Sequence, residues 1–200
     1  MSDQELVKLA REGDRAAFSA IVKRHQSRVY GTALHITGSH SDAEDIAQEA
    51  FIRAYRGLAK FDGRSELFTW LYRITVNTAL NQLRGQGRQR KLARAGADRV
   101  AQFGGRPEAP GVGVLDPEGG VLLTERTRRV FAAMEELSET LRVTLVLATV
   151  EGLPYRQISE ILEIPEGTVA WRVNEARKQL RERLAQGAGQ PGKKSDEQAI

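Results

Sequence analysis

The chain has 200 residues, of which 40% are hydrophobic and 28% charged, and its formal net charge is +4. This length allows one domain or two small ones, and the absence of cysteine excludes disulfides, thiolate zinc sites and a cysteine nucleophile. A charged N-terminus and the lack of a long apolar run argue against a signal peptide or a membrane span, so we expect a cytoplasmic protein without a cofactor.

Residues 1–84 form a first zone that is helix-patterned and nearly free of proline. Residues 3–11 and 14–37 are predicted helices, and Ser41 and Glu44 form a capping box that begins a third helix. Its predicted buried residues are Ala47, Phe51 and Tyr55, with Ile46, Ala50 and Leu58 beside them. Its opposite face carries Asp45, Gln48, Glu49, Ile52, Arg53 and Arg56. From the pattern alone this is a solvated face, on which Ile52 is a slight indication of a partner.

A turn at residues 61–65 precedes a helix that Ser65 caps and that runs to about Arg84. Its inner stripe is Leu67, Leu71, Ile74 and Thr78, and a second face collects Trp70, Arg73, Asn77 and Arg84. Aromatic and basic side chains on one face suit single-stranded nucleic acid, because rings stack on bases while cations contact phosphates. The alternative, that Trp70 belongs to the core and Arg73 is a plain surface charge, has equal weight on this pattern. The basic segment that follows, residues 84–106, favours nucleic acid.

Residues 85–120 are rich in glycine and proline, which predicts a flexible, basic linker between two domains. Such a segment of about 36 residues has a root-mean-square span of roughly 30–36 Å. The tail, residues 187–200, is predicted to be disordered.

Helical periodicity returns in residues 121–186, which end in a predicted helix-turn-helix. Residues 155–162 form the supporting helix, residues 163–165 the turn, and Pro165 suits the first position of the second helix. The predicted inward residues of the pair are Ile158, Ile161, Leu162, Val169, Val173, Ala176, Leu180 and Leu184. The outward face of the second helix carries Trp171, Asn174, Glu175 and Lys178, flanked by Arg177 and Arg181. Helical hairpins with basic faces are common, but this geometry favours one helix in the DNA major groove.

Three motifs together, residues 42–51, residues 61–80 and the C-terminal helix pair, resemble bacterial sigma factors of the extracytoplasmic-function (ECF) group of the sigma-70 family. The resemblance covers nearly all of residues 3–184 and implies an all-α protein of two small helical domains joined by a flexible linker. Residues 1–84 correspond to region 2, which binds core RNA polymerase and melts the −10 promoter element. Residues 121–186 correspond to region 4, whose helix-turn-helix reads the −35 element.

The resemblance also implies roles for individual residues. By this resemblance, the polymerase clamp binds the helix that carries Asp45, Gln48, Glu49, Ile52 and Arg53. We therefore reject the interpretation of this face as merely solvated. The −10 element contacts Phe61, Arg64, Ser65, Trp70, Arg73, Asn77, Asn81, Arg84 and Arg88, and the turn at 61–65 receives an extruded base. The −35 element contacts Tyr155, Arg156, Thr168, Ala170, Trp171, Arg172, Asn174, Glu175, Arg177 and Lys178. Expected partners are the clamp and flap of the large polymerase subunits, promoter DNA and, as a candidate, an anti-sigma factor.

The recognition helix departs from the pattern of the family at three positions. Ala170 and Trp171 stand where a basic residue and a serine are usual, and Glu175 stands where a second basic residue is common. Fewer cations weaken phosphate attraction, while Glu and Asn remain able to read bases directly. We therefore expect an atypical −35 preference in which Trp171 supplies an apolar contact.

Two other classes of function compete with this interpretation. A stand-alone helix-turn-helix regulator explains residues 121–186 but leaves the aromatic and basic helix, the linker and residues 42–51 without a role. An enzyme is the second alternative, because His35, His40 and Asp42 lie close together in the sequence. Their spacing matches no compact ligand motif, so we expect neither a metal site nor a catalytic residue.

Overall fold

The computed structural model describes residues 1–63, 65–100 and 125–187, so Arg64, most of the predicted linker and the predicted disordered tail lie outside the described residues. All regular structure in these ranges is helical, as the sequence predicts. None of the described helices is long and apolar enough to cross a membrane.

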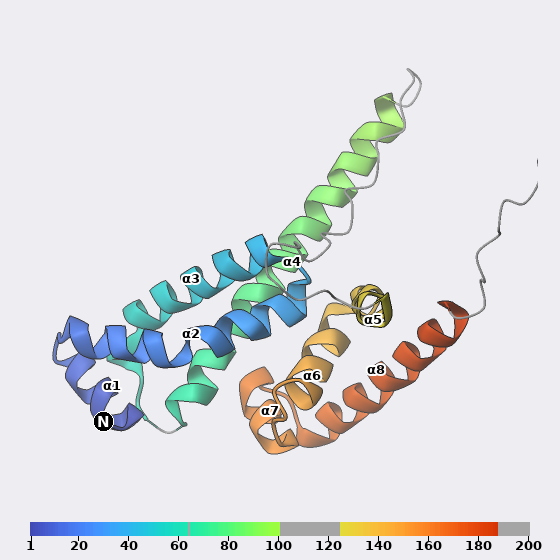
Figure 1. The fold of residues 1–200 in the computed structure, drawn as a ribbon. Coiled ribbons are helices and arrows are strands. Elements are labelled where there is room, and N and C mark those ends of the chain that lie inside the picture. Colours follow the sequence, from blue (N-terminus) through green and yellow to red (C-terminus); the bar gives the residue numbers. More distant parts are fainter. Residues whose placement is uncertain (64, 101–124, 188–200) are drawn as a thin grey trace, which may run out of the picture.

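The N-terminal unit is a bundle in which α2 packs against α1, α3 and α4 (Figure 1). Its elements are α1 (Asp3–Arg11), α2 (Arg15–Thr37), α3 (His40–Gly57), the short 3-10 helix η1 (Leu58–Lys60) and α4 (Leu67–Val100). Side chains set the starts of the first two helices: Ser2 and Glu5 form a capping box, and Asp14 accepts from the amides of Ala16 and Ala17. The predicted range of the first helix is confirmed, and the second begins one residue later than predicted because Asp14 is its cap.

The start of α3 differs from the prediction. Ser39, not Ser41, is the N-cap, and its hydroxyl accepts a hydrogen bond from the amide of Asp42 at 3.2 Å. The preceding helix ends at Gly38, which has the left-handed φ of 72° that favours glycine. This early reversal brings Ser39 to the cap position and leaves Ser41 exposed inside the first turn.

Two further expectations for the N-terminal unit were wrong. Tyr55 is 49% exposed, because the buried stripe of α3 runs through Ala43, Ile46, Ala50 and Ala54 and ends beside Leu58. Helix α4 does not end near Arg84 but continues to Val100, and its last turns project from the bundle (Figure 1). Glycine disfavours a helix interior by only about 1 kcal/mol, and Arg, Gln, Lys, Leu and Ala, which are good helix formers, surround the three glycines of this stretch.

The C-terminal unit consists of four helices, and its last two form the predicted helix-turn-helix. Its elements are α5 (Glu125–Glu135), α6 (Glu139–Thr149), α7 (Tyr155–Leu162) and α8 (Glu166–Gly187). Helix α8 packs across α5, α6 and α7. Ile158, Ile161, Val169, Val173 and Ala176 are at most 2% exposed, as the periodicity predicts, whereas Leu162, Leu180 and Leu184 are only partly buried.

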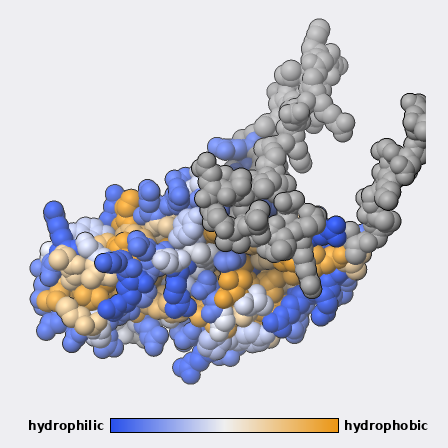
Figure 2. All heavy atoms as spheres, viewed as in Figure 1, coloured by the Kyte–Doolittle hydropathy of each residue, from blue (hydrophilic) through white to orange (hydrophobic). Residues whose placement is uncertain are grey.

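The two units share one hydrophobic cluster, in addition to the clusters that each unit buries by itself. Helix α7 packs against α4, and α6 packs against α2. The common cluster joins Ile36, Tyr72 and Val76 of the first unit to Val146 and Ile158 of the second, all at most 1% exposed. Full burial of one such aliphatic side chain contributes roughly 1.5–3 kcal/mol. Most of the surface in view is hydrophilic, with hydrophobic patches scattered over it (Figure 2).

Candidate functional site

The outer face of α3 lies beside a groove that this helix forms with α2. The groove has a volume of about 660 Å³, and Val22, Tyr30, Gln48, Phe51 and Ile52 are among the residues that line it. Ile52 is 45% exposed, although it is a large apolar side chain. Asp45, Gln48 and Arg53 of the predicted polymerase-binding set are exposed, and half-buried Glu49 accepts a hydrogen bond from Arg53 at 2.6 Å. Of the five predicted residues, Gln48 and Ile52 line the groove, and the other three lie on the same helix.

The turn after η1 lies against α1 and the start of α4. Phe61 is 7% exposed, and its ring centroid lies 5.0 Å from that of Trp70. A cavity of about 850 Å³ opens between this turn and α1, and Asp3, Lys8, Phe61, Ser65 and Leu67 are among its lining residues. The cavity is large enough for a nucleobase, and its lining combines apolar side chains such as Phe61 and Leu67 with charged ones such as Asp3 and Lys8.

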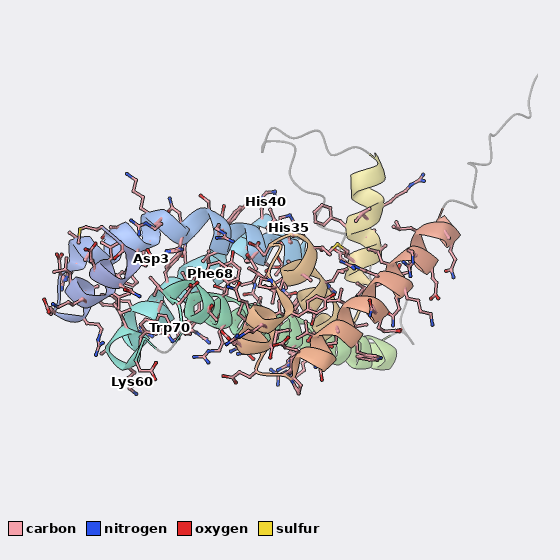
Figure 3. The ribbon with its side chains drawn as sticks, turned by 90° about the horizontal axis from the view of Figure 1, so that it is seen from below. Asp3, His35, His40, Lys60, Phe68 and Trp70 are labelled. Carbon is pink, nitrogen blue, oxygen red and sulfur yellow. The ribbon has the colours of Figure 1, made fainter. Side chains whose placement is uncertain are left out.

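Trp70 is half-buried near the start of α4, where Figure 3 shows it together with Phe68. Its ring fits closely against α3: a Cβ built on Gly57 would lie 3.2 Å from Cζ2 of Trp70. The core interpretation of Trp70 and the nucleic-acid interpretation thus each describe part of this side chain, since part of the ring packs and part of it stays accessible.

A polar strip follows one face of α4. Arg73, Asn77, Asn81, Arg84 and Arg88 recur at spacings of three or four, and all are exposed except Arg73, which is half-buried. Such a strip of cations and amides can track the phosphates of a nucleic-acid strand. Two of its arginines already have carboxylate partners in the C-terminal unit: Arg73 pairs with Glu163 at 3.0 Å and Arg84 with Glu139 at 3.6 Å.

The turn of the helix-turn-helix is held by hydrogen bonds around Glu163. This residue has a φ of 54° and ends α7, and the amide of Ile164 then donates to the carbonyl of Ser159. The Ser159 hydroxyl donates to the carbonyl of Ile164 at 2.6 Å. Pro165 differs slightly from the prediction: its carbonyl accepts from Thr168 and Val169, so it precedes the helix as the cap and is not the first helical residue.

The outer face of α8 is largely exposed. Trp171 is 61% exposed, and Asn174, Arg177 and Lys178 are exposed beside it. Arg156 at the start of α7 has a side chain that is 82% exposed. The remaining members of the predicted −35 set are partly buried: Tyr155, Thr168, Ala170, Arg172 and Glu175. The structure thus brings a tryptophan, an asparagine and several cations together on a helix shaped to enter a groove.

Comparison with known proteins assigns the two units. The Sigma-70 region 2 family matches residues 21–89, and the Sigma-70 region 4 family matches residues 127–180. The chain is 37% identical over 184 residues to the "ECF RNA polymerase sigma-E factor" of Haemophilus influenzae, which covers 92% of this chain and 96% of that protein. It is 36% identical over 178 residues to the "RNA polymerase sigma-H factor" of Pseudomonas aeruginosa, covering 89% of this chain and 91% of that one. The chain belongs to the ECF sigma factors of the sigma-70 family.

As a sigma factor it binds core RNA polymerase and directs promoter-specific transcription initiation through regions 2 and 4. Solved structures show the same fold. The structure of CnrH in complex with the cytosolic domain of CnrY has a TM-score of 0.65 and 20% sequence identity, covering 92% of this chain and 97% of that chain. We use region 2 below for the N-terminal unit, α1 to α4, and region 4 for α5 to α8.

The residues that join the two regions of this sigma factor did not stand out in the sequence. Glu151, in the segment between α6 and α7, has a side chain that is only 10% exposed and accepts from Thr32 and Tyr72 of region 2. Arg142 of α6 is 8% exposed and donates to the carbonyl of Ile36 at 3.0 Å. One signal was present: α6 is apolar on almost all sides, which indicates a helix buried on more than one face.

The histidines take part in local contacts. The ring of His35 stacks on Phe131 at 6.1 Å and its Nδ1 contacts the carbonyl of Gly31, while Nδ1 of His40 contacts the hydroxyl of Tyr30 (Figure 3 labels both histidines). Asp42 instead accepts hydrogen bonds from two glutamine amides of α4. Across the three described ranges, no group of His, Cys, Asp and Glu residues could hold a metal ion.

Proposed function

We propose that α3 of this sigma factor docks on the polymerase clamp through Asp45, Gln48, Glu49, Ile52 and Arg53. The exposed Ile52 at the edge of an apolar groove supports this role, because a partner that covers it gains apolar burial. The surrounding charges supply orientation more than affinity. We further propose that region 4 contacts the polymerase flap, and that the protein shares the cytoplasm with polymerase.

Promoter opening is the role we propose for α4 and for the turn at residues 61–65. Extruding a base costs a few kcal/mol, and stacking a base on an aromatic ring contributes roughly 1–3 kcal/mol in return. The accessible part of Trp70 provides that stacking surface, while Arg73, Asn77, Asn81, Arg84 and Arg88 hold the phosphates and the fork. The cavity beside Phe61 and Ser65 accepts the extruded base, and Arg64 belongs to the same turn.

Promoter recognition at the −35 element is the role we propose for α8. The observation that carries this is the outward face of α8, where Trp171 remains 61% exposed and Asn174, Arg177 and Lys178 flank it. Asn pairs with adenine and Glu with cytosine in the major groove, and Trp171 supplies an apolar contact such as one with a thymine methyl. If Trp171→Ala leaves −35 affinity and sequence preference unchanged, this part of the proposal is wrong.

Run-off transcription with purified core polymerase tests the function as a whole. Core polymerase with this sigma factor should produce promoter-specific transcripts, and polymerase alone should not. A stand-alone regulator would bind DNA but would confer no specific initiation on core polymerase. Mapping binding sites across the genome then yields both promoter elements.

An anti-sigma factor is a further proposed partner. A structure of a similar fold shows the sigma factor RpoE of Bartonella quintana with the anti-sigma factor NepR, at a TM-score of 0.61 and 24% identity. In this chain the α2–α3 groove offers an apolar surface of the kind that such a regulator covers. Competition between a co-encoded protein and core polymerase for this sigma factor tests the idea.

A further inference from the structure

A carboxylate at the start of α3 holds two glutamines of α4. Oδ1 of Asp42 accepts a hydrogen bond from the side-chain amide of Gln82 at 2.7 Å. The side-chain amide of Gln86 donates to the same carboxylate, 3.1 Å from Oδ1 and 3.2 Å from Oδ2. All three side chains are half-buried. Because the two glutamines are four residues apart, one carboxylate contacts two successive turns on the same face of α4.

The arginines that we assign to −10 DNA lie on the other side of these two turns. Arg84 and Arg88 are also four residues apart, and each follows one of the glutamines by two positions, which is about 200° around the helix axis. Both arginines are exposed, whereas the glutamines are turned toward α3. The contact with Asp42 on one side of α4 therefore fixes the direction in which the two arginines point.

This part of α4 needs support from outside the helix. Gly85 and Gly87 flank Gln86, and a glycine in a helix interior costs about 1 kcal/mol relative to alanine. A Cβ built at either glycine meets no neighbouring atom within 4 Å, so close packing does not require glycine at these positions. Among the side chains that the structure describes, that of Gln86 is the farthest along α4 to hydrogen-bond α3. Asp42 thus holds α4 where the helix is intrinsically weak.

The same carboxylate belongs to the helix that we propose docks on polymerase. Asp42 stands in the first turn of α3, where its amide donates to the Ser39 hydroxyl, and Asp45 of the docking face follows about one turn later. We infer that Asp42 is a positioning residue for promoter opening: it holds Arg84 and Arg88 where they reach the phosphates of the −10 strand, and it ties that position to the docking helix. This inference rests on the proposed assignment of both arginines to −10 DNA.

Charge and position predict opposite effects when this carboxylate is removed. On charge alone, Asp42→Ala removes a negative charge near a cationic surface and should raise the affinity for DNA. Loss of position should instead lower it, because the two arginines no longer stand together along the strand. Each phosphate contact that is lost on a single strand makes the dependence of log affinity on log salt shallower by about 0.7. We expect an affinity about three- to tenfold lower and a slope shallower by about 0.7–1.4.

Binding of the holoenzyme to a fork-junction DNA, measured over a range of salt concentrations, tests the inference. The DNA carries the −10 strand of a promoter found by mapping binding sites across the genome. The double variant Gln82→Ala/Gln86→Ala removes the same contact from α4 and should reproduce the effect of Asp42→Ala. Asp42→Asn keeps an acceptor oxygen and should lose less affinity. Glu44→Ala is the matched control: it removes an exposed carboxylate near the start of the same helix, so the affinity should not fall.

A rescue variant separates positioning of α4 from a role in the cap of α3. Gly87→Ala favours the helix by about 1 kcal/mol and adds no contact. In the Asp42→Ala background it should recover most of the lost DNA affinity, although it cannot repair a defect at the start of α3. Asp42→Ala should also bind core polymerase as tightly as the wild type does, which shows that α3 is folded.

The double variant Arg84→Ala/Arg88→Ala is the reference for the proposed function, with an affinity about tenfold lower and a slope shallower by about 1.4. If it binds the fork-junction DNA as the wild type does, the assignment of these arginines to −10 DNA is wrong. If it binds weakly, but Asp42→Ala or the glutamine double variant binds as tightly as the wild type or more tightly, the inference is overturned. A loss in Asp42→Ala that Gly87→Ala does not restore would assign Asp42 to the cap of α3 and would overturn it too.

Discussion

The hydroxyl of Tyr72 in region 2 donates a hydrogen bond of 2.8 Å to Glu151 in region 4, across a separation of 79 residues in the sequence. The phenol ring is 1% exposed and forms part of the core that both regions share. Tyr72 also follows directly on Leu71, a core residue of region 2, and precedes Arg73, which belongs to the proposed DNA surface. One turn of α4 thus links the core of region 2, the interface with region 4 and the promoter contacts.

Tyr72→Phe should lower the free energy of unfolding by about 1–2 kcal/mol, because Glu151 loses a donor while it remains nearly buried. Urea denaturation followed by circular dichroism measures this change. Tyr55→Phe is the control, since Tyr55 is 49% exposed and its replacement should leave the unfolding midpoint in place. Equal midpoints for the wild type and Tyr72→Phe would mean that the Tyr72–Glu151 hydrogen bond contributes nothing to stability.

Alkaline pH should weaken the same contact. Burial, together with the Glu151 carboxylate, raises the pKa of Tyr72 to about 12, from an ordinary value of about 10. The stabilisation is therefore complete below pH 10, where the phenol is protonated in both the folded and the unfolded chain. Between pH 10 and about 12 only the unfolded chain loses the proton, so stability declines through this window.

Tyrosinate absorbance at 295 nm tests this directly. The chain has four tyrosines, and a wild-type titration should contain a late component near pH 12 that is absent from Tyr72→Phe. A late component that persists in Tyr72→Phe would show that the late ionisation does not belong to Tyr72.

Two serines near the start of α3, only two positions apart, should differ in their contribution to stability. Ser39→Ala should lower the free energy of unfolding by about 1 kcal/mol, because the amide of Asp42 loses its acceptor. Ser41→Ala should have almost no effect, since Ser41 is exposed inside the first turn. Thermal unfolding of both variants, measured in parallel, provides the comparison. A larger loss of stability for Ser41→Ala than for Ser39→Ala would indicate that Ser41 caps the helix, as the sequence suggested.

Features that depend on local interactions were predictable from the sequence. The spacing of Val169, Val173 and Ala176 placed the buried face of α8, and thereby also the exposure of Trp171 on the opposite face. Asp14 before α2 is a comparable case, because a cap needs only its own helix. The choice between Ser39 and Ser41 was different: both can cap, and the reversal at Gly38 decided which of them does.

The closure of region 4 over region 2 depends on contacts that no local pattern encodes. Val76 and Ala79 of α4 lie outside the predicted inner stripe, yet they are buried in the cluster that both regions share. No local pattern marks Glu151 as buried, because its donors Thr32 and Tyr72 are distant in the sequence. The length of α4 was missed for a different reason. Its glycines suggested a linker, but their small helix penalty is spread over a stretch of favourable neighbours.

Two isoleucines on α3 allow an effect on polymerase binding to be distinguished from an effect on fold stability. Ile52 is 45% exposed at the α2–α3 groove, whereas Ile46, on the same helix, is fully buried in the shared core. Ile52→Ala should weaken binding to core polymerase by about tenfold, which corresponds to roughly 1.4 kcal/mol of lost apolar contact, and should leave the melting temperature unchanged.

Ile46→Val should show the opposite pattern. Removing one buried methylene should lower the free energy of unfolding by roughly 0.5–1.5 kcal/mol, while affinity for polymerase stays at the wild-type level. Titration of fluorescently labelled sigma factor with core polymerase, together with calorimetric melting, measures both quantities for both variants. If Ile52→Ala binds polymerase as well as Ile46→Val does, the exposed apolar edge of the groove is not the docking surface, and another part of region 2 must contact the clamp.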